Sequence, residues 1–173
     1  AELNTDSGGF GEGGNGGDII IEASDRVTVS NAGVDELLAR SRISSTGSFG
    51  EGSGGRIDIT TPVLEVLDGG EVRVTAFGNG NGGDIFIEAS DRVTFAGTGV
   101  IFPSRASSEV SIGSNGNGGQ IHIATRLLQI LDGAELSANT FGGGNGGNIV
   151  IETSDRITID NGSIFSSAEE GST

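Results

Sequence analysis

One short motif recurs five times along this chain: two glycines, a polar residue and then Ile-x-Ile. The glycine pairs begin at residues 16, 54, 82, 118 and 146, so the intervals between them are 38, 28, 36 and 28 residues. Long and short units therefore alternate, and one of each makes a higher-order repeat of 64 to 66 residues. Self-similarity at a period of roughly 20 to 50 residues is typical of stacked repeat architectures, so this motif constrains the fold strongly.

The apolar residues of each unit alternate with polar ones between clusters of Gly, Asn, Asp and Ser, which is the signature of short β-strands. The chain contains 33 glycines and eight phenylalanines but no Trp or Tyr, which is unlike an ordinary globular core. No stretch keeps an apolar period of 3.6 residues long enough for a helix. The sequence therefore predicts an all-β fold.

Three strand-like runs occur in each unit, and together they predict a triangular coil. The two isoleucines of the motif point to one face, so ten of them are expected to fill an interior. Stacked coils, with each strand pairing in parallel with its equivalent in the next unit at ~4.8 Å, satisfy the backbone hydrogen bonds. We predict a single β-helix segment over residues 1–173, about five to six coils with partial coils at both ends. The complete coils begin near Ile19, Ile57, Ile85, Ile121 and Ile149.

The residue before each glycine pair is asparagine in four of the five units: Asn15, Asn81, Asn117 and Asn145. Stacked asparagines can form a ladder of amide-to-amide hydrogen bonds along the axis. Asparagine also suits a turn with positive φ, which explains the pattern without any ladder. Both interpretations remain open at this point.

The residue that opens the first run alternates in charge where neighbouring units would meet. Asp18, Arg56 and Asp84 occupy this place in the first three units, followed by Gln120 and Asn148. Like charges placed directly opposite each other destabilise a sheet, whereas opposite charges help. The order therefore predicts that each unit stacks on the very next one.

The long units contain additional residues before their third run. These insertions bring Leu37 and Leu38 in one unit, and Ile101 and Phe102 in another, outside the predicted coil. Insertions in repeat proteins usually form loops on one side. The four apolar side chains are expected either to cover a flank of the coil or to bind a partner.

Charge and composition exclude several classes of function. The formal net charge is −15, with nine Arg and no Lys, which disfavours binding to nucleic acid or to an anionic membrane. No stretch approaches the ~20 apolar residues of a membrane-spanning helix, and without cysteine there is no disulfide framework. The chain opens inside a short unit and stops inside a long one, so we expect a segment of a longer protein.

Two kinds of glycine-rich ligand site have to be compared with this pattern. Residues 13–21, with Asp18, formally fit the calcium-binding nonapeptide, but that site needs tandem nine-residue turns and the copies here lie 64 to 66 residues apart. A glycine turn entering a strand is the preferred interpretation. The glycines lead into strands, not into a helix, and no Lys follows, so nucleotide-binding loops fail on context. No cofactor or metal is predicted.

An enzyme acting on polysaccharides is a further possibility, because carboxylates such as Asp25, Asp58 and Glu65 are available. His122, the only histidine, is expected on the outer face between Phe86 and Val150. The chain shows no non-repeating catalytic set. We therefore predict no catalytic residues.

The set of motifs resembles the repeats of large filamentous-haemagglutinin-like exoproteins, particularly the cyanobacterial ones. The resemblance rests on Gly-Asn-Gly-Gly-(Asp/Asn)-Ile-x-Ile-Glu, on Ser-Asp-Arg, on Leu-Asp-Gly-(Gly/Ala)-Glu and on Thr-Phe-Gly, and it covers essentially the whole chain. It implies a right-handed parallel β-helix, export by two-partner secretion, and a role as surface adhesin or matrix fibre.

We therefore expect a stiff rod segment of a secreted or cell-surface bacterial exoprotein. Its partners would be neighbouring coils of the same or an identical chain and a surface glycan or protein, without nucleic acid or membrane insertion. The alternatives are a homopolymeric extracellular fibre in which chains stack coil end to coil end, and a polysaccharide-processing β-helix enzyme.

Overall fold

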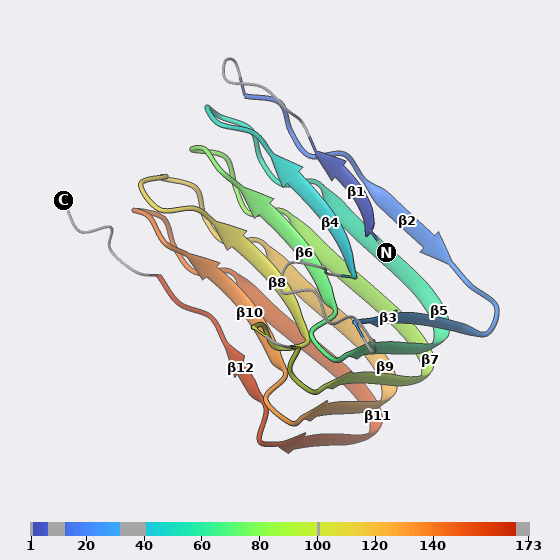
Figure 1. The fold of residues 1–173 in the computed structure, drawn as a ribbon. Helices are drawn as coiled ribbons and strands as arrows, with labels where there is room; N and C mark the ends of the chain where they lie inside the picture. Colours follow the sequence, from blue (N-terminus) through green and yellow to red (C-terminus); the bar gives the residue numbers. More distant parts are fainter. Residues whose placement is uncertain (1, 7–12, 32–40, 100, 169–173) are drawn as a thin grey trace.

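The protein is a parallel β structure in the computed structural model, which describes residues 2–6, 13–31, 41–99 and 101–168. These residues form twelve strands and no helix, so none of them forms a helix able to cross a membrane. The prediction of an all-β chain is confirmed. The strands lie in two sheets, each made of parallel neighbours (Figure 1).

The first sheet consists of short strands, and we call it the short-strand sheet. Its order follows the chain, and every strand pairs in parallel with the next member. The strands are β1 (Glu2–Asp6), β4 (Arg42–Gly47), β6 (Glu71–Ala76), β8 (Arg105–Val110), β10 (Glu135–Thr140) and β12 (Ser163–Phe165).

The second sheet, the long-strand sheet, holds the Ile-x-Ile motifs. Its strands are β2 (Ile19–Glu22), β5 (Arg56–Leu67), β7 (Asp84–Ala96), β9 (Gln120–Leu131) and β11 (Asn148–Asp160), with β3 (Arg26–Ser30) beside β5. The prediction of three separate short strands per unit is wrong for the units that contain these four longer strands. In β5, β7, β9 and β11 the first and second runs are one continuous strand. Neighbouring strands stay paired on both sides of a shift in register, such as the one between Thr61 and Val63.

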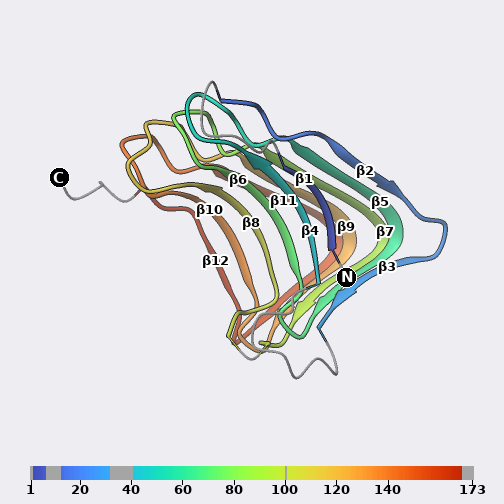
Figure 2. The ribbon, with the colours of Figure 1, turned by 45° about the horizontal axis from the view of Figure 1, so that its top comes forward.

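The chain passes from one sheet to the other and back once in each unit. Equivalent residues of consecutive units are paired: Ile19 with Ile57, Ile57 with Ile85, Ile85 with Ile121, and Ile121 with Ile149. The predicted stacking of each unit on the very next one is confirmed. Figure 2 shows the equivalent strands lying one behind another.

The core lies between the two sheets. Seven of the ten motif isoleucines are buried, and Ile21, Ile149 and Ile151 in the outermost units are partly buried against the same cluster. The short-strand sheet contributes buried residues such as Val72, Val74 and Leu136. Apolar residues at the same inward position in successive units therefore form continuous rows.

Candidate functional site

The turns before the glycine pairs carry a row of hydrogen bonds that runs from unit to unit. The Oδ1 atom of Asn15 accepts from the backbone N–H of Ser53 at 2.9 Å, and Ser53 Oγ accepts from Asn81 N at 3.1 Å. Asn81 and Asn117 accept in the same way from the residue that follows in the next unit, at 3.0 and 2.9 Å. The structure thus brings Asn15, Ser53, Asn81, Asn117 and Asn145 into one row.

This row differs in its bonding from an amide-to-amide ladder. Four of its five bonds run from a backbone N–H to a side-chain oxygen, and only Asn145 Nδ2 donates to the Asn117 amide, at 3.3 Å. None of these residues has a positive φ, which the structure records for Asp68, Asp132 and Asn161 instead. Satisfying a backbone donor that the turn leaves open is therefore the physical reason for the asparagines.

Asp18, the calcium candidate, makes the same kind of contact at the start of the first run. Its Oδ1 accepts from Arg56 N at 3.0 Å, and Asp84 accepts likewise from Gln120 N at 2.8 Å. The described residues contain no group of three or more His, Asp or Glu side chains placed to hold a metal ion. The geometry gives Asp18 a structural contact.

The four loop residues divide into two sets. Leu37 and Leu38 lie outside the described residues. Ile101 is 49% exposed, whereas Phe102 is half-buried with the Arg105 guanidinium 5.7 Å from its ring centre. The loop is held by a backbone bond from Gly99 N to Phe102 O at 2.7 Å.

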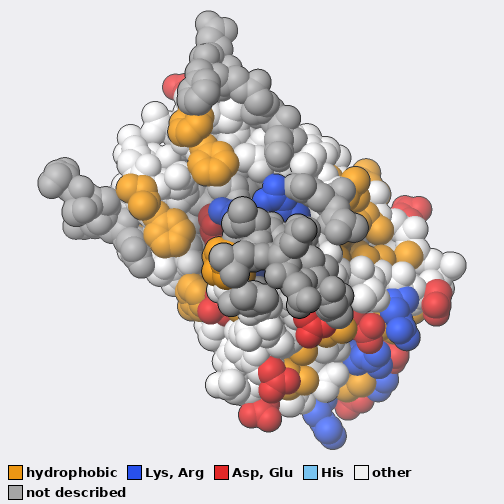
Figure 3. Space-filling model, in the orientation of Figure 1, with side chains coloured by type: hydrophobic (Ala, Val, Ile, Leu, Met, Phe, Trp, Pro, Cys, Tyr) orange, Lys and Arg blue, Asp and Glu red, His pale blue; other side chains and the backbone are white. Residues whose placement is uncertain are grey.

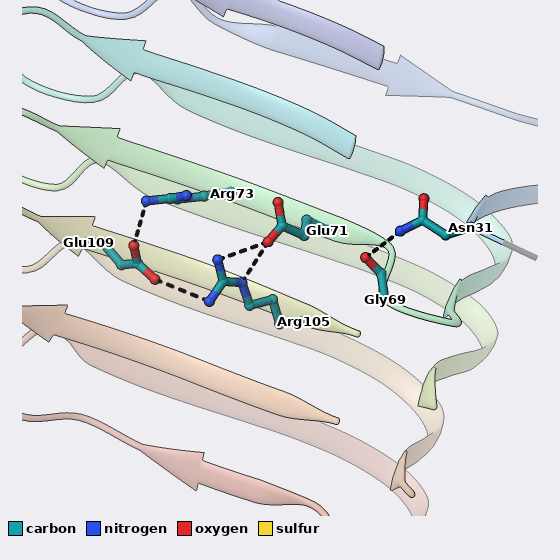
Figure 4. A network of polar contacts seen from close by, with 6 residues as sticks. All are labelled: Asn31, Gly69, Glu71, Arg73, Arg105 and Glu109. Carbon is teal, nitrogen blue, oxygen red and sulfur yellow. Dashed lines mark hydrogen bonds and ion pairs between the residues drawn. The ribbon is translucent and has the colours of Figure 1, made fainter. Parts of the chain in front are cut away.

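The outer face of the short-strand sheet carries a network of ion pairs (Figure 4). Glu71 is fully buried, and its Oε1 receives the Arg105 guanidinium at 2.8 Å. Glu109 binds Arg73 at 2.7 Å and also approaches Arg105, at 3.8 Å. These four residues come from the central strands β6 and β8, which the repeat places side by side. The network holds both carboxylates against guanidinium groups and leaves neither of them as an obvious general acid.

Replacing Arg105 with leucine is expected to destabilise the protein by about 2 kcal/mol, because the buried carboxylate of Glu71 loses the guanidinium 2.8 Å from its Oε1. The paired change of Arg105→Leu with Glu71→Leu is expected to recover some of that loss. Urea unfolding followed by circular dichroism measures both. A double variant no more stable than the Arg105 single variant would contradict the coupling.

A short row of polar side chains, one of which is Arg73 of this network, crosses the sheet. Ser44, Arg73 and Ser107 are register neighbours on β4, β6 and β8. Among the described residues, the buried Ser44 Oγ, Arg73 Nε and Ser107 Oγ have no hydrogen-bond partner. Such groups usually bind water or a ligand when they are satisfied.

Apolar side chains line the end of the same sheet, where its strands turn back toward the other one. Phe49, Phe77, Ile112 and Phe141 come from four successive units, and hydrophobic side chains follow this margin, on the left in Figure 3. The Phe49 and Phe77 rings stack with their centres 5.7 Å apart. A groove of about 230 Å³ lies beside these side chains, and its lining includes Phe77, Ile112, Phe141, Arg73 and Glu109.

A second charge cluster marks the bend of the long-strand sheet. Arg126 binds Asp91 at 2.6 Å and Asp155 at 2.9 Å, so it links the units on either side. The hydrogen bond from Arg126 lowers the pKa of Asp91 below its ordinary value, and the reciprocal bond raises the pKa of Arg126. Glu65 likewise bridges Arg26 and Arg92, at 3.6 and 3.0 Å.

The Arg126 pair predicts a small pH dependence. Because the pKa of Asp91 is lowered on folding, its contribution to stability is present above the unfolded value of ~3.9 and is lost as the pH falls through the folded value. Arg126→Gln is therefore expected to lower the melting temperature slightly at pH 7, and the difference from wild type should vanish near pH 2. Thermal melts across this range test it. Arg156→Gln is the control, because Arg156 has no ion pair to the described residues. A difference in melting temperature between Arg126→Gln and wild type that persisted at pH 2 would contradict the assignment of the effect to Asp91.

The remaining enzyme candidates lie in different regions of the outer surface. Arg56 binds Asp58 at 2.7 Å, which together with nearby acidic groups raises the pKa of Arg56. Glu65 lies in the second run of its strand, and Asp25 is exposed. His122 lies in register between Phe86 and Val150, with Glu152 3.7 Å from its Nε2. The structure does not bring these groups together.

Sequence reasoning missed two features of the site. The buried Glu71 stands in the Leu-Asp-Gly-(Gly/Ala)-Glu motif, and Phe77 and Phe141 stand in the Thr-x-Phe-Gly and Thr-Phe-Gly motifs. In both cases the residues occupy recurring motif positions, which is the signal that could have identified them. Whether such a side chain lies inside, outside or in a groove depends on the neighbouring units, which the spacing alone does not place.

Comparison of the chain with protein-family models, with curated proteins and with solved structures gave no significant match.

Proposed function

We propose that this chain is a segment of a right-handed parallel β-helix that serves as a stiff, adhesive rod in a secreted or cell-surface bacterial exoprotein. The observation that carries the proposal is the stacking of each unit on the next. Every strand between the outermost ones has a parallel neighbour from the preceding and the following unit. Addition of units along one axis has no internal limit, which is how repeat proteins extend.

Handedness is inferred from a general rule. A connection between parallel strands of one sheet is right-handed in about 98% of cases, and consecutive strands of each sheet are joined in this chain by crossing to the other sheet. The resemblance to filamentous-haemagglutinin-like repeats points in the same direction. It also supports export by two-partner secretion and a cyanobacterial origin as elements of the proposal.

A rod that repeats itself suits attachment better than catalysis. Ion pairs hold Asp58, Glu65, Glu71 and Glu109 beside arginines, and those of the three glutamates bridge neighbouring units. A side chain used this way stabilises the stack and is poorly placed to donate a proton. We accordingly propose that the chain is not an enzyme.

Adhesion is tested with beads coated with the chain and washed over a cyanobacterial biofilm matrix. Retention several-fold above that of beads coated with casein is expected. Equal retention of the two kinds of bead would overturn the adhesive function. Release of reducing sugar from cellulose or polygalacturonate, abolished by a single carboxylate substitution, would instead support an enzyme.

A second candidate, the homopolymeric fibre, is favoured by one specific observation. Ile157 and Ile159 on β11 are 45% and 50% exposed, although their register partners Leu128 and Ile130 are fully buried. An apolar row thus ends uncovered at the outermost strand, together with the open edge of the sheet. Filaments seen by electron microscopy in solutions of the purified chain would support the fibre, and a monomer at high concentration would exclude it.

A further inference from the structure

We propose that the groove beside Phe77 and Phe141 binds a neutral polysaccharide, whose sugar rings lie along the apolar row at the end of the short-strand sheet. This proposal rests on the adhesive function proposed above and names the ligand and its site. The row consists of Phe49, Phe77, Ile112 and Phe141, and we call it the aromatic row.

Three members of the aromatic row are exposed although their side chains are large and apolar, and the fourth, Phe141, is half-buried. Phe49 is 52% exposed, Phe77 39% and Ile112 80%. They come from successive units, so they follow the stacking axis along the margin where hydrophobic side chains gather in Figure 3. A stable protein partner needs about 800 Å² on each side, whereas a narrow row of rings suits a linear polymer.

Polar groups lie next to the rings, as recognition of a sugar requires. The groove of about 230 Å³ is lined by Phe77 and Phe141 together with the Arg73–Glu109 ion pair. Its volume is below the ~300–1,000 Å³ of common small-molecule sites, so it suits one ring at a time. An apolar C–H face can pack on phenyl rings, while hydroxyl groups bond to a charged pair that both donates and accepts.

The charge of the short-strand sheet favours a neutral polysaccharide over an anionic one. The four central strands β4, β6, β8 and β10 carry equal numbers of positive and negative residues: Arg42, Arg73, Arg105, Glu71, Glu109 and Glu135. These strands are formally neutral, and the net charge of −15 resides on the rest of the chain. An anionic polymer approaching the face is repelled by that charge, whereas a neutral one is not. The ligand class is therefore a neutral glycan.

Affinity electrophoresis tests the proposal, because the acidic chain migrates well in native gels. The probes are hydroxyethyl cellulose as a neutral glycan and polygalacturonate as an acidic one. Hydroxyethyl cellulose is expected to retard the chain and polygalacturonate is not. The Phe77→Ala/Phe141→Ala variant should weaken binding at least about tenfold, since it removes two stacking surfaces. Each single variant should show a smaller loss of binding.

Phe165→Ala is the matched control, because it removes an equally exposed ring, 40% exposed, outside the groove. It is expected to bind as wild type does, and circular dichroism verifies that all variants are folded. Equal retardation of wild type and the double variant would overturn the site while adhesion stands. Preference for polygalacturonate, or stronger binding to immobilised casein than to the glycan, would overturn the ligand class. If the wild-type chain shows neither retardation by hydroxyethyl cellulose nor bead retention above that of casein, the adhesive function itself is overturned.

Discussion

Gly119→Ala is expected to destabilise the protein by about 3 kcal/mol, near the upper end of the usual cost of overpacking. An added Cβ at this glycine would lie 1.7 Å from the carbonyl oxygen of Gly83, and 2.5 Å from its carbonyl carbon. These are backbone atoms of the preceding unit and cannot rotate away. The same site is tied down by Ser108, whose Oγ donates to Gly83 O and accepts from Gly119 N. The substitution therefore has to separate two stacked units.

Gly143→Ala is the control for this prediction. Its Cβ would meet the end of the Asn115 side chain at 2.9 Å, which can move, and no backbone atom of the described residues other than its chain neighbours lies within 4 Å. A small loss is expected there. Urea unfolding of both variants compares them directly. Equal stabilities would show that the units are not packed backbone to backbone at Gly119.

Phe95→Ala is expected to cost about 4 kcal/mol, because truncating a buried phenylalanine removes apolar contacts and leaves a cavity. Phe95 is fully buried on β7 within the core between the two sheets. Its register neighbours are Val66 in the preceding unit and Ile130 in the following one. Because a buried neighbour lies on each side of the ring, we expect the surrounding structure to collapse only slightly into the cavity.

Phe95→Ile provides the comparison, since it installs the residue type found at the equivalent place in the next unit. The loss is expected to be below about 1.5 kcal/mol because the shape of the row is retained. Thermal and urea unfolding of both variants give the two values. If the alanine and isoleucine variants lost the same stability, position 95 would not lie in a packed interior row.

The sequence predicted the stacking well because the repeat acts at the level of whole units. The fivefold motif places Ile57 against Ile85 and Ile85 against Ile121, and parallel pairing follows from that equivalence. The number of strands was predicted less well. A turn such as Thr60-Thr61-Pro62 suggests an interruption in the sequence, yet its neighbours in the adjacent unit bend in the same way, so pairing continues through it.

The candidate site was less predictable for a related reason. Asn15 and Asn117 lie in one row, and the backbone donors that they satisfy belong to other units, which a single motif does not show. Glu71 resembles an exposed charge in its motif, and it is buried next to Arg105, a residue of the following unit. The exposure of Phe77 and the partial burial of Phe141 likewise depend on what the neighbouring turns cover.

The stacking of units is the central claim, and a distance between equivalent residues tests it most directly. The chain has no cysteine, so Ile20→Cys and Val150→Cys provide unique spin-label sites, both at exposed outward positions. Pairing of Ile20 with Asp58, Asp58 with Phe86, Phe86 with His122, and His122 with Val150 separates them by four steps. Pulsed electron paramagnetic resonance should give a narrow distribution near roughly 19 Å, the sum of four strand spacings. A broad distribution, or a distance beyond about 30 Å, would contradict the stacked structure.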